Sequence, residues 1–161
     1  MSIRSKPEWQ QMVWANVEQH GWFCQHVFDP EGDDPNFSYT SGFTKTLSAP
    51  EFIIFGLSNE LHHAMLCEIF HQIENGVSVS HGQKWEGLLG GDFVCYSFKC
   101  THENLFEEYA LSSKWFWNDQ GHAGDPEVYQ IVWPGAQNGL FPWDQGCDPQ
   151  VISSQPQLYL K

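Results

Sequence analysis

Three side chains suited to metal binding recur every four residues in this sequence: His63, Cys67 and His71. Imidazole and thiolate groups are good zinc ligands, and this spacing places all three on one stripe of a helix. From His63 to His71 the stripe extends about 12 Å along the axis, so the three groups cannot reach one ion. We therefore expect no metal, and we interpret the stripe as the boundary between core and solvent.

Tyr39 and His63 form a second candidate for chemistry. Tyr39 lies on a predicted strand, and His63 lies one turn into a helix that directly follows the next strand, so short connections keep the two elements adjacent. A helix N-terminus favours a neutral imidazole, which can accept a hydrogen bond from a phenol or a ligand. We expect both residues to contribute to any discrete site. The alternative is that His63 is a boundary residue bonded to the backbone.

Established catalytic motifs are absent from the sequence, which has no nucleophile elbow, phosphate-binding loop or dinucleotide fingerprint. The glycines at 87–91 lack the lysine of a phosphate cradle, so we predict a turn there. In the acidic loop 29–35 the glycine is misplaced for calcium binding and no glutamate closes the loop, which favours a solvated turn. We expect no cofactor. The sequence does not decide whether the protein is an enzyme, and it favours a protein that is not one.

The charge of the chain restricts its partners. Its 161 residues include 7 Lys and Arg against 20 Asp and Glu, a formal net charge of −13. Nucleic-acid binding needs clustered cations, whereas the basic residues here are scattered singly, so we expect no nucleic-acid binding. The negative charge fits a neutral or basic protein partner better. An excess of acidic residues that merely keeps the protein soluble explains the composition equally well.

The five cysteines form an odd set without a C-x-x-C pair, so we expect free thiols. Cys95 and Cys100 should fall on opposite faces of a strand and act as small buried hydrophobes. The N-terminus has no apolar stretch followed by a cleavage site, and no window reaches the roughly 18 apolar residues of a membrane span. We expect a cytoplasmic protein that makes no membrane contact.

The elements that must position these side chains follow an α+β pattern. We predict helices at 7–19 (capped by Ser5), 59–75 and 102–112, and strands at 22–28, 37–43, 52–57, 77–80, 84–88, 93–99 and 128–133. Leu61, Met65, Ile69 and Ile73 recur every four residues and should pack the second helix onto the sheet. Without strict βαβ alternation, we expect an antiparallel or mixed sheet of about five or more strands, with about two to three packed helices. No linker or repeat interrupts the chain, so residues 1–161 should form a single domain with its core at about 7–158.

Two aromatic runs, 115–117 and 141–143, could wall a pocket for a flat ligand or form a patch for a partner. Each single member is better explained as a core residue. Burial of all of them would nevertheless be unusual.

The segment Tyr39–Thr44, followed by Pro50–Leu57 and the helix that carries His63, resembles the bacterial domain-of-unknown-function 4262 family. Later segments fit in the same order: Gly21-Trp22 lies before the first strand, and Gln130–Pro134, Phe141–Asp144, Asp148-Pro149 and Gln155-Pro156 follow. The resemblance covers nearly the whole chain, but the family has no established catalytic role that could be transferred to this sequence. It does imply a set of polar candidate site residues: Tyr39, Thr40, His63, Gln130, Trp143 and Gln155. A histidine common in the family before the Pro-Glu pair is Ala49 here, which weakens any mechanism that pairs it with His63.

Two functions are consistent with these observations. The first is a non-catalytic binding module for a neutral or basic protein, of the kind that neutralises a basic toxin as an immunity protein does. The second is a small enzyme or small-molecule-binding domain with a His/Tyr site, whose ligand the sequence does not name. A pocket that holds Tyr39, His63 and Trp143 together would favour the second, and a flat acidic face rimmed by aromatics would favour the first.

Overall fold

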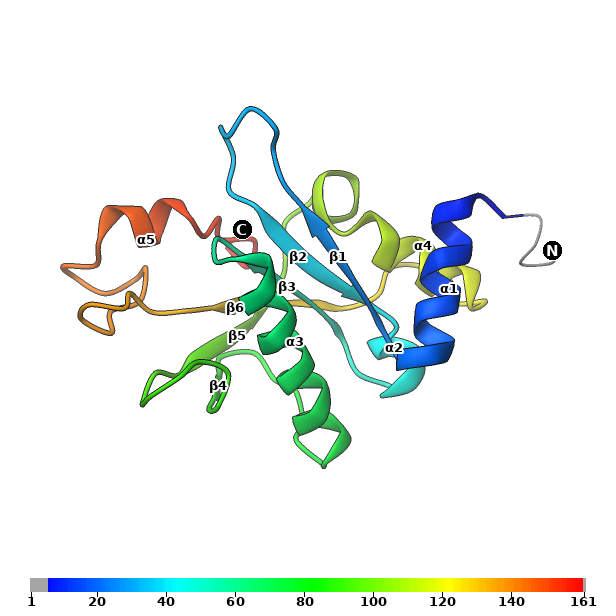
Figure 1. Cartoon of the computed structure of the whole chain (residues 1–161), viewed down its shortest axis with the longest axis horizontal. Helices are drawn as coiled ribbons and strands as arrows, with labels where there is room; N and C mark the ends of the chain where they lie inside the picture. Colours follow the sequence, from blue (N-terminus) through cyan, green and yellow to red (C-terminus); the bar gives the residue numbers. More distant parts are fainter. Residues whose placement is uncertain (1–5, 161) are drawn as a thin grey trace.

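A six-stranded mixed sheet forms the centre of the computed structural model, which describes residues 6–160 (Figure 1). The strands are β1 (Phe23–Val27), β2 (Phe37–Ser41), β3 (Glu51–Phe55), β4 (Gln83–Trp85), β5 (Cys95–Lys99) and β6 (Val128–Val132). They lie in the order β1-β2-β3-β6-β5-β4, and only the β3–β6 pair is parallel. The predicted α+β class with a mixed sheet is confirmed.

Three main helices accompany the sheet. The helical elements are α1 (Glu8–His20), α2 (Phe43–Thr46), α3 (Asn59–Glu74), the π-helix η2 (Leu105–Tyr109), α4 (Leu111–Asp119) and α5 (Pro149–Ser153). In Figure 1, α3 crosses one face of the sheet, while α1 and α4 lie together at one end of it. None of the helices within residues 6–160 has the length and apolar character needed to cross a membrane.

Helix α3 is the element that the sequence predicts best. The Ser58 side chain accepts a hydrogen bond of 3.2 Å from the backbone N–H of Leu61, so it caps the helix as expected. Met65 and Ile69 are completely buried, which confirms the predicted packing stripe, and Leu61 and Ile73 are half-buried beside them. The buried side also includes three further residues spaced by four: His62, Leu66 and Phe70.

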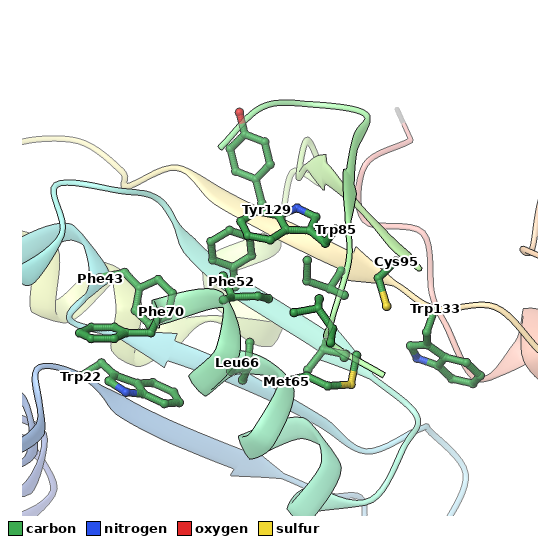
Figure 2. Packing of buried hydrophobic residues seen from close by; sticks show 14 residues of the cluster. Trp22, Phe43, Phe52, Met65, Leu66, Phe70, Trp85, Cys95, Tyr129 and Trp133 are labelled. Carbon is green, nitrogen blue, oxygen red and sulfur yellow. The ribbon is translucent and has the colours of Figure 1, made fainter. Parts of the chain in front are cut away.

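Two apolar clusters lie on opposite faces of the sheet. Successive residues of β3 alternate between them: Phe52 and Ile54 join the cluster under α3, and Ile53 and Phe55 join the one under η2. Figure 2 shows the first cluster, with Trp22 close to Phe43 and Phe70 at one end and Trp133 at the other. Because both faces of β3 are buried, its almost wholly apolar sequence is explained, as predicted for a central strand.

Two predicted elements are wrong. Residues 102–112 do not form one helix: η2 is followed by a break at Ala110, and the longer helix α4 starts at Leu111. Helix α4 depends on long-range packing, because Phe116 is buried against α1, and its aromatic residues have only moderate helix propensity. Residues 77–80 form no strand. The backbone N–H of Ser80 donates to the Gln83 side chain, so it is not available to a neighbouring strand.

The first helix is confirmed within one residue at each end. The predicted cap residue Ser5 lies outside the described residues, and Pro7 occupies the N-cap position without a side-chain hydrogen bond. The helix ends at Gly21, which has a φ of 92°. A Cβ at that position would also lie 3.0 Å from the ring of Phe70, so glycine suits both the turn and the packing.

Candidate functional site

Gln130 and Gln155, two of the predicted site residues, hold the C-terminal segment against β6. Gln130 donates to the Pro156 carbonyl at 2.6 Å and accepts from the Leu158 N–H at 3.0 Å. Gln155 accepts from the Trp133 N–H at 3.0 Å and donates to the Trp133 carbonyl at 2.9 Å. Because both side chains are buried and bond to main chain through both ends of their amides, they stabilise the fold.

Tyr39 and Thr40 lie next to each other on β2, and the structure gives both of them internal partners. Tyr39, only 3% exposed, accepts a hydrogen bond of 3.1 Å from the backbone N–H of Ser112 at the start of α4. Burial raises the pKa of this phenol. Thr40 donates to the Glu51 carboxylate at 2.7 Å and accepts from the Phe52 N–H at 2.9 Å.

Glu51 is a buried carboxylate that sequence reasoning missed. It accepts hydrogen bonds from the N–H groups of Gly42 (2.8 Å) and Phe43 (3.0 Å) and from the Thr44 hydroxyl (3.2 Å), in addition to Thr40. Burial raises its pKa to about 7, although the surrounding donors favour the charged form. One signal was available, since an acidic residue directly after Pro50 begins an otherwise apolar strand.

A cleft of about 640 Å³ lies beside Glu51, between the α2–β3 loop and the α4–β6 loop. Thr44 links the two features, because its hydroxyl touches Glu51 and also accepts a hydrogen bond of 3.2 Å from Gln120, which lines the cleft. Ser48 also lines the cleft; it has a φ of 52° and is the one non-glycine residue within 6–160 with positive φ. The arrangement could hold a small polar ligand near a carboxyl group that titrates near neutrality.

His63 does not meet Tyr39, contrary to the prediction. His63 is exposed on α3 and stacks on Trp22 with ring centroids 5.4 Å apart, on the α3 side of the sheet. Tyr39 belongs to the cluster on the opposite face, because alternate residues of a strand point to opposite sides. The alternative interpretation, in which His63 is a boundary residue, agrees with this placement. The partner of His63 is the Trp22 ring, however, and not the backbone.

The stripe of His63, Cys67 and His71 lies at the boundary of the core, as predicted. Cys67 is half-buried and both histidines are exposed. Within residues 6–160, no three His, Cys, Asp or Glu side chains are close enough together to hold a metal ion. Cys95 and Cys100 lie in different apolar clusters, which confirms that they occupy opposite faces.

A hydrogen-bonded chain of side chains under the N-terminal turns of α3 was also missed. The Ser38 hydroxyl lies 2.6 Å from Nδ1 of His26 and 2.7 Å from Nδ1 of His62, and the Cys24 thiol lies 3.7 Å from Nε2 of His26. Burial, together with the charge of His26, lowers the pKa of His62 to about 4. Burial raises the pKa of Cys24 to about 12, so this cysteine is a thiol at neutral pH and a poor nucleophile.

Trp143 belongs to what we call the aromatic face, which consists of Tyr96, Phe98, Phe141, Trp143 and Tyr159. Trp143 stacks on Phe141 with centroids 4.9 Å apart and an interplanar angle of 2°, yet 47% of its surface is exposed. Tyr96 and Phe98 project from β5 on the side opposite to α3, because their neighbour Cys95 packs into the α3-side cluster. The aromatic face lines a depression of about 590 Å³ that Asp144 also borders.

The six predicted site residues thus define no single pocket. Thr40 bonds to Glu51, and Tyr39 bonds to the start of α4. Gln130 and Gln155 hold the C-terminal segment, and His63 and Trp143 are exposed on different faces. Together, the fold and these placements define a small α+β domain in which four of the six candidate residues, Tyr39, Thr40, Gln130 and Gln155, are buried and hydrogen-bonded within the fold.

The chain belongs to the family described as a domain of unknown function, DUF4262, whose family model matches residues 16–148. This range includes five of the six predicted site residues, and Gln155 lies beyond it. No curated protein and no solved structure matches the chain.

Proposed function

We propose that this protein is a non-catalytic binding module for a basic protein partner, and that the aromatic face is its contact surface. The exposure of Trp143 carries the proposal: 47% of this large side chain contacts solvent although it stacks on Phe141. Tryptophans held on a rigid base are typical anchors of protein interfaces. The edge-on contact with Phe98, at 5.4 Å, further restricts the indole.

Charge favours a basic partner. Asp144 borders the aromatic face, and the pKa of the nearby Cys147 thiol is raised by burial and then by the charges of Asp148 and Asp144. Lys84, opposite Tyr96 in the β4–β5 register, is neutralised by Glu86 at 3.5 Å. A Lys or Arg of the partner could therefore contact a carboxylate and lie over an aromatic ring, and the net charge of −13 would steer it there.

The proposal includes a cytoplasmic location, because all five cysteines are free thiols, as a reducing compartment favours. Neutralisation of a basic toxin by an immunity-type protein is one function with this chemistry. Two buried groups fit a structural role better than a catalytic one: burial raises the pKa of the Cys24 thiol to about 12, and the Glu51 carboxylate is enclosed by hydrogen-bond donors.

A small-molecule-binding function is the second candidate, and the cleft beside Thr44 favours it. The cleft has a volume suited to a small ligand and lies next to the titratable Glu51. A fragment screen by protein NMR tests this alternative. Specific binding here would shift the amide signals of Thr44, Ser48 and Gln120, and fragments that shift none of them would exclude it.

The main proposal is tested by affinity capture with immobilised wild-type protein and the Trp143→Ala variant. Trp9→Ala is the matched control, because Trp9 is 44% exposed but lies on α1. We expect wild type and control to retain a protein with an isoelectric point above about 9, in a salt-sensitive manner, and Trp143→Ala to lose it. The complex should then re-form from purified components. Identical capture by all three proteins, or capture of acidic proteins only, would contradict the proposal.

A further inference from the structure

A separate cavity of about 470 Å³ lies where the loop between β1 and β2 meets η2. That loop projects beyond the sheet at the top of Figure 1. The cavity is lined mainly by four aromatic and three acidic side chains: Phe28, Phe37, Phe55, Tyr109, Asp29, Asp34 and Glu108. Neither the proposed partner contact nor the cleft beside Thr44 involves these residues.

The aromatic residues of the cavity differ in exposure and packing. The Tyr109 ring packs edge-on against Phe37 at 5.4 Å and against Phe55 at 5.6 Å, so core contacts fix the floor of the cavity. Phe28 follows the last residue of β1 and exposes 69% of its surface, the largest fraction among the exposed large hydrophobic residues of the described part. An exposed phenylalanine beside a fixed aromatic floor can close over an apolar ligand group.

The three carboxylates of the cavity are not neutralised within the described chain. Asp29 accepts hydrogen bonds from the N–H groups of Glu31, Asp33 and Asp34 at 3.0–3.1 Å, which fix the carboxylate and lower its pKa. Asp34 and Glu108 line the cavity together with Tyr109, and the pKa of the Tyr109 phenol is raised by burial and then by the charges of Glu108 and Asp34. No Lys or His of residues 6–160 forms an ion pair with any of the three acids, and four lysines pair elsewhere.

The charges are also dispersed around the cavity. No three acidic side chains of the described residues come close enough together to ligate a metal ion. An organic cation is larger than a metal ion and is attracted by aromatic ring faces, so it can interact with separated carboxylates across an apolar cavity.

We propose that this cavity binds an organic cation, namely a primary ammonium or guanidinium group on an aliphatic chain. The aliphatic chain packs between Phe28 and the Tyr109 floor, and the cationic group lies between Asp34 and Glu108. The source is either a free alkylamine or a Lys or Arg side chain of a polypeptide, which share this chemistry. The assignment does not rest on the aromatic face or on its proposed partner.

Titration calorimetry and protein NMR test the proposal with three probes: pentylammonium, lysine capped at both ends, and neutral pentanol. We expect at least one cationic probe to bind saturably, to shift the amide signals of Phe28, Asp34 and Tyr109, and to bind more weakly with added salt. Pentanol should not bind. Binding of pentylammonium alone identifies a free amine as the source, and binding of capped lysine identifies a polypeptide side chain.

Variants locate the binding. Asp34→Asn combined with Glu108→Gln should weaken binding by about tenfold or more, and Phe28→Ala should weaken it severalfold. These side chains are exposed, so the melting temperature should not change. Asp92→Asn, an exposed acid at another cavity, and Trp143→Ala should bind like wild type. Equal binding of pentanol, an unaffected double variant, or no saturable binding of either cation up to about 10 mM would overturn the proposal.

Discussion

The Thr40 hydroxyl donates a hydrogen bond of 2.7 Å to the Glu51 carboxylate, and neither residue has any exposure to solvent. The same carboxylate accepts hydrogen bonds from the N–H groups of Gly42 and Phe43, where the short helix α2 begins. A single buried acid therefore connects β3, the end of β2 and α2. Because burial raises the pKa of this acid to about 7, its protonation state changes within the physiological range.

This raised pKa makes stability depend on pH in a defined direction. Between the ordinary value of 4.5 and about 7 the folded state holds a proton at Glu51 that the unfolded chain has released. The free energy of unfolding contributed by this group therefore falls as the pH rises through that window. Urea denaturation of wild type and Glu51→Gln at about pH 5 and about pH 7.5 measures it.

Glu51→Gln should lower stability at both pH values by about 1–3 kcal/mol, because its NH₂ group must face backbone donors. The free energy of unfolding of wild type should decrease more between the two pH values than that of the variant. Equal pH dependence in the two proteins would mean that Glu51 does not titrate in this range.

His62 should produce the opposite slope. Its pKa is lowered from 6.5 to about 4 by burial and by the charge of His26, so the folded state excludes a proton that the unfolded chain binds. The stability contributed by neutral His62 is present above 6.5 and is lost as the pH falls towards 4. Denaturation of His62→Gln across this range should show less acid destabilisation than wild type, with exposed His71→Gln as the control.

The effects of His62 and Glu51 partly cancel in wild type, so only the comparison between variants separates them. Identical acid sensitivity of wild type and His62→Gln would contradict the lowered pKa of His62.

The parts of the fold that follow local patterns were predictable, and the parts that depend on distant partners were not. Ser58 and the four-residue spacing of Met65 and Ile69 define α3, because capping and periodicity act within a few residues. By contrast, α4 forms where Phe116 finds a buried place against α1, roughly a hundred residues away in the chain. No local pattern contains that contact.

Dependence on distant partners also explains why the roles of the candidate site residues could not be predicted. A glutamine such as Gln130 is equally consistent with a ligand contact or a structural bond, and its partner Leu158 lies 28 residues further along the chain. Ser38, His26 and His62 come from three elements, so their hydrogen bonds were invisible before the strand register was known. The sequence indicated that not all members of the two aromatic runs are buried, but it did not identify Trp143 as an exposed one.

The hydrogen bonds by which Gln130 and Gln155 hold the C-terminal segment should be important for stability. Gln130→Ala leaves the Leu158 N–H and the Pro156 carbonyl without their partner, and Gln155→Ala does the same to the main chain of Trp133. Each variant should lose about 1–3 kcal/mol of unfolding free energy. Chemical denaturation should find exposed Gln145→Ala within about 0.5 kcal/mol of wild type. If Gln130→Ala had the same free energy of unfolding as wild type, water or a movement of the chain would have to replace the hydrogen bonds of Gln130.

Tyr39 and His63, which the sequence suggested as partners, should respond very differently to conservative substitution. Tyr39→Phe removes the acceptor of the buried Ser112 N–H, so it should cost about 1–3 kcal/mol of unfolding free energy. His63→Gln removes an exposed ring that stacks on Trp22, and its cost should stay below about 1 kcal/mol. A double-mutant cycle by chemical denaturation tests whether the two residues interact. Because they lie on opposite faces of the sheet, we expect their effects to add within about 0.5 kcal/mol, and a larger coupling energy would contradict this placement.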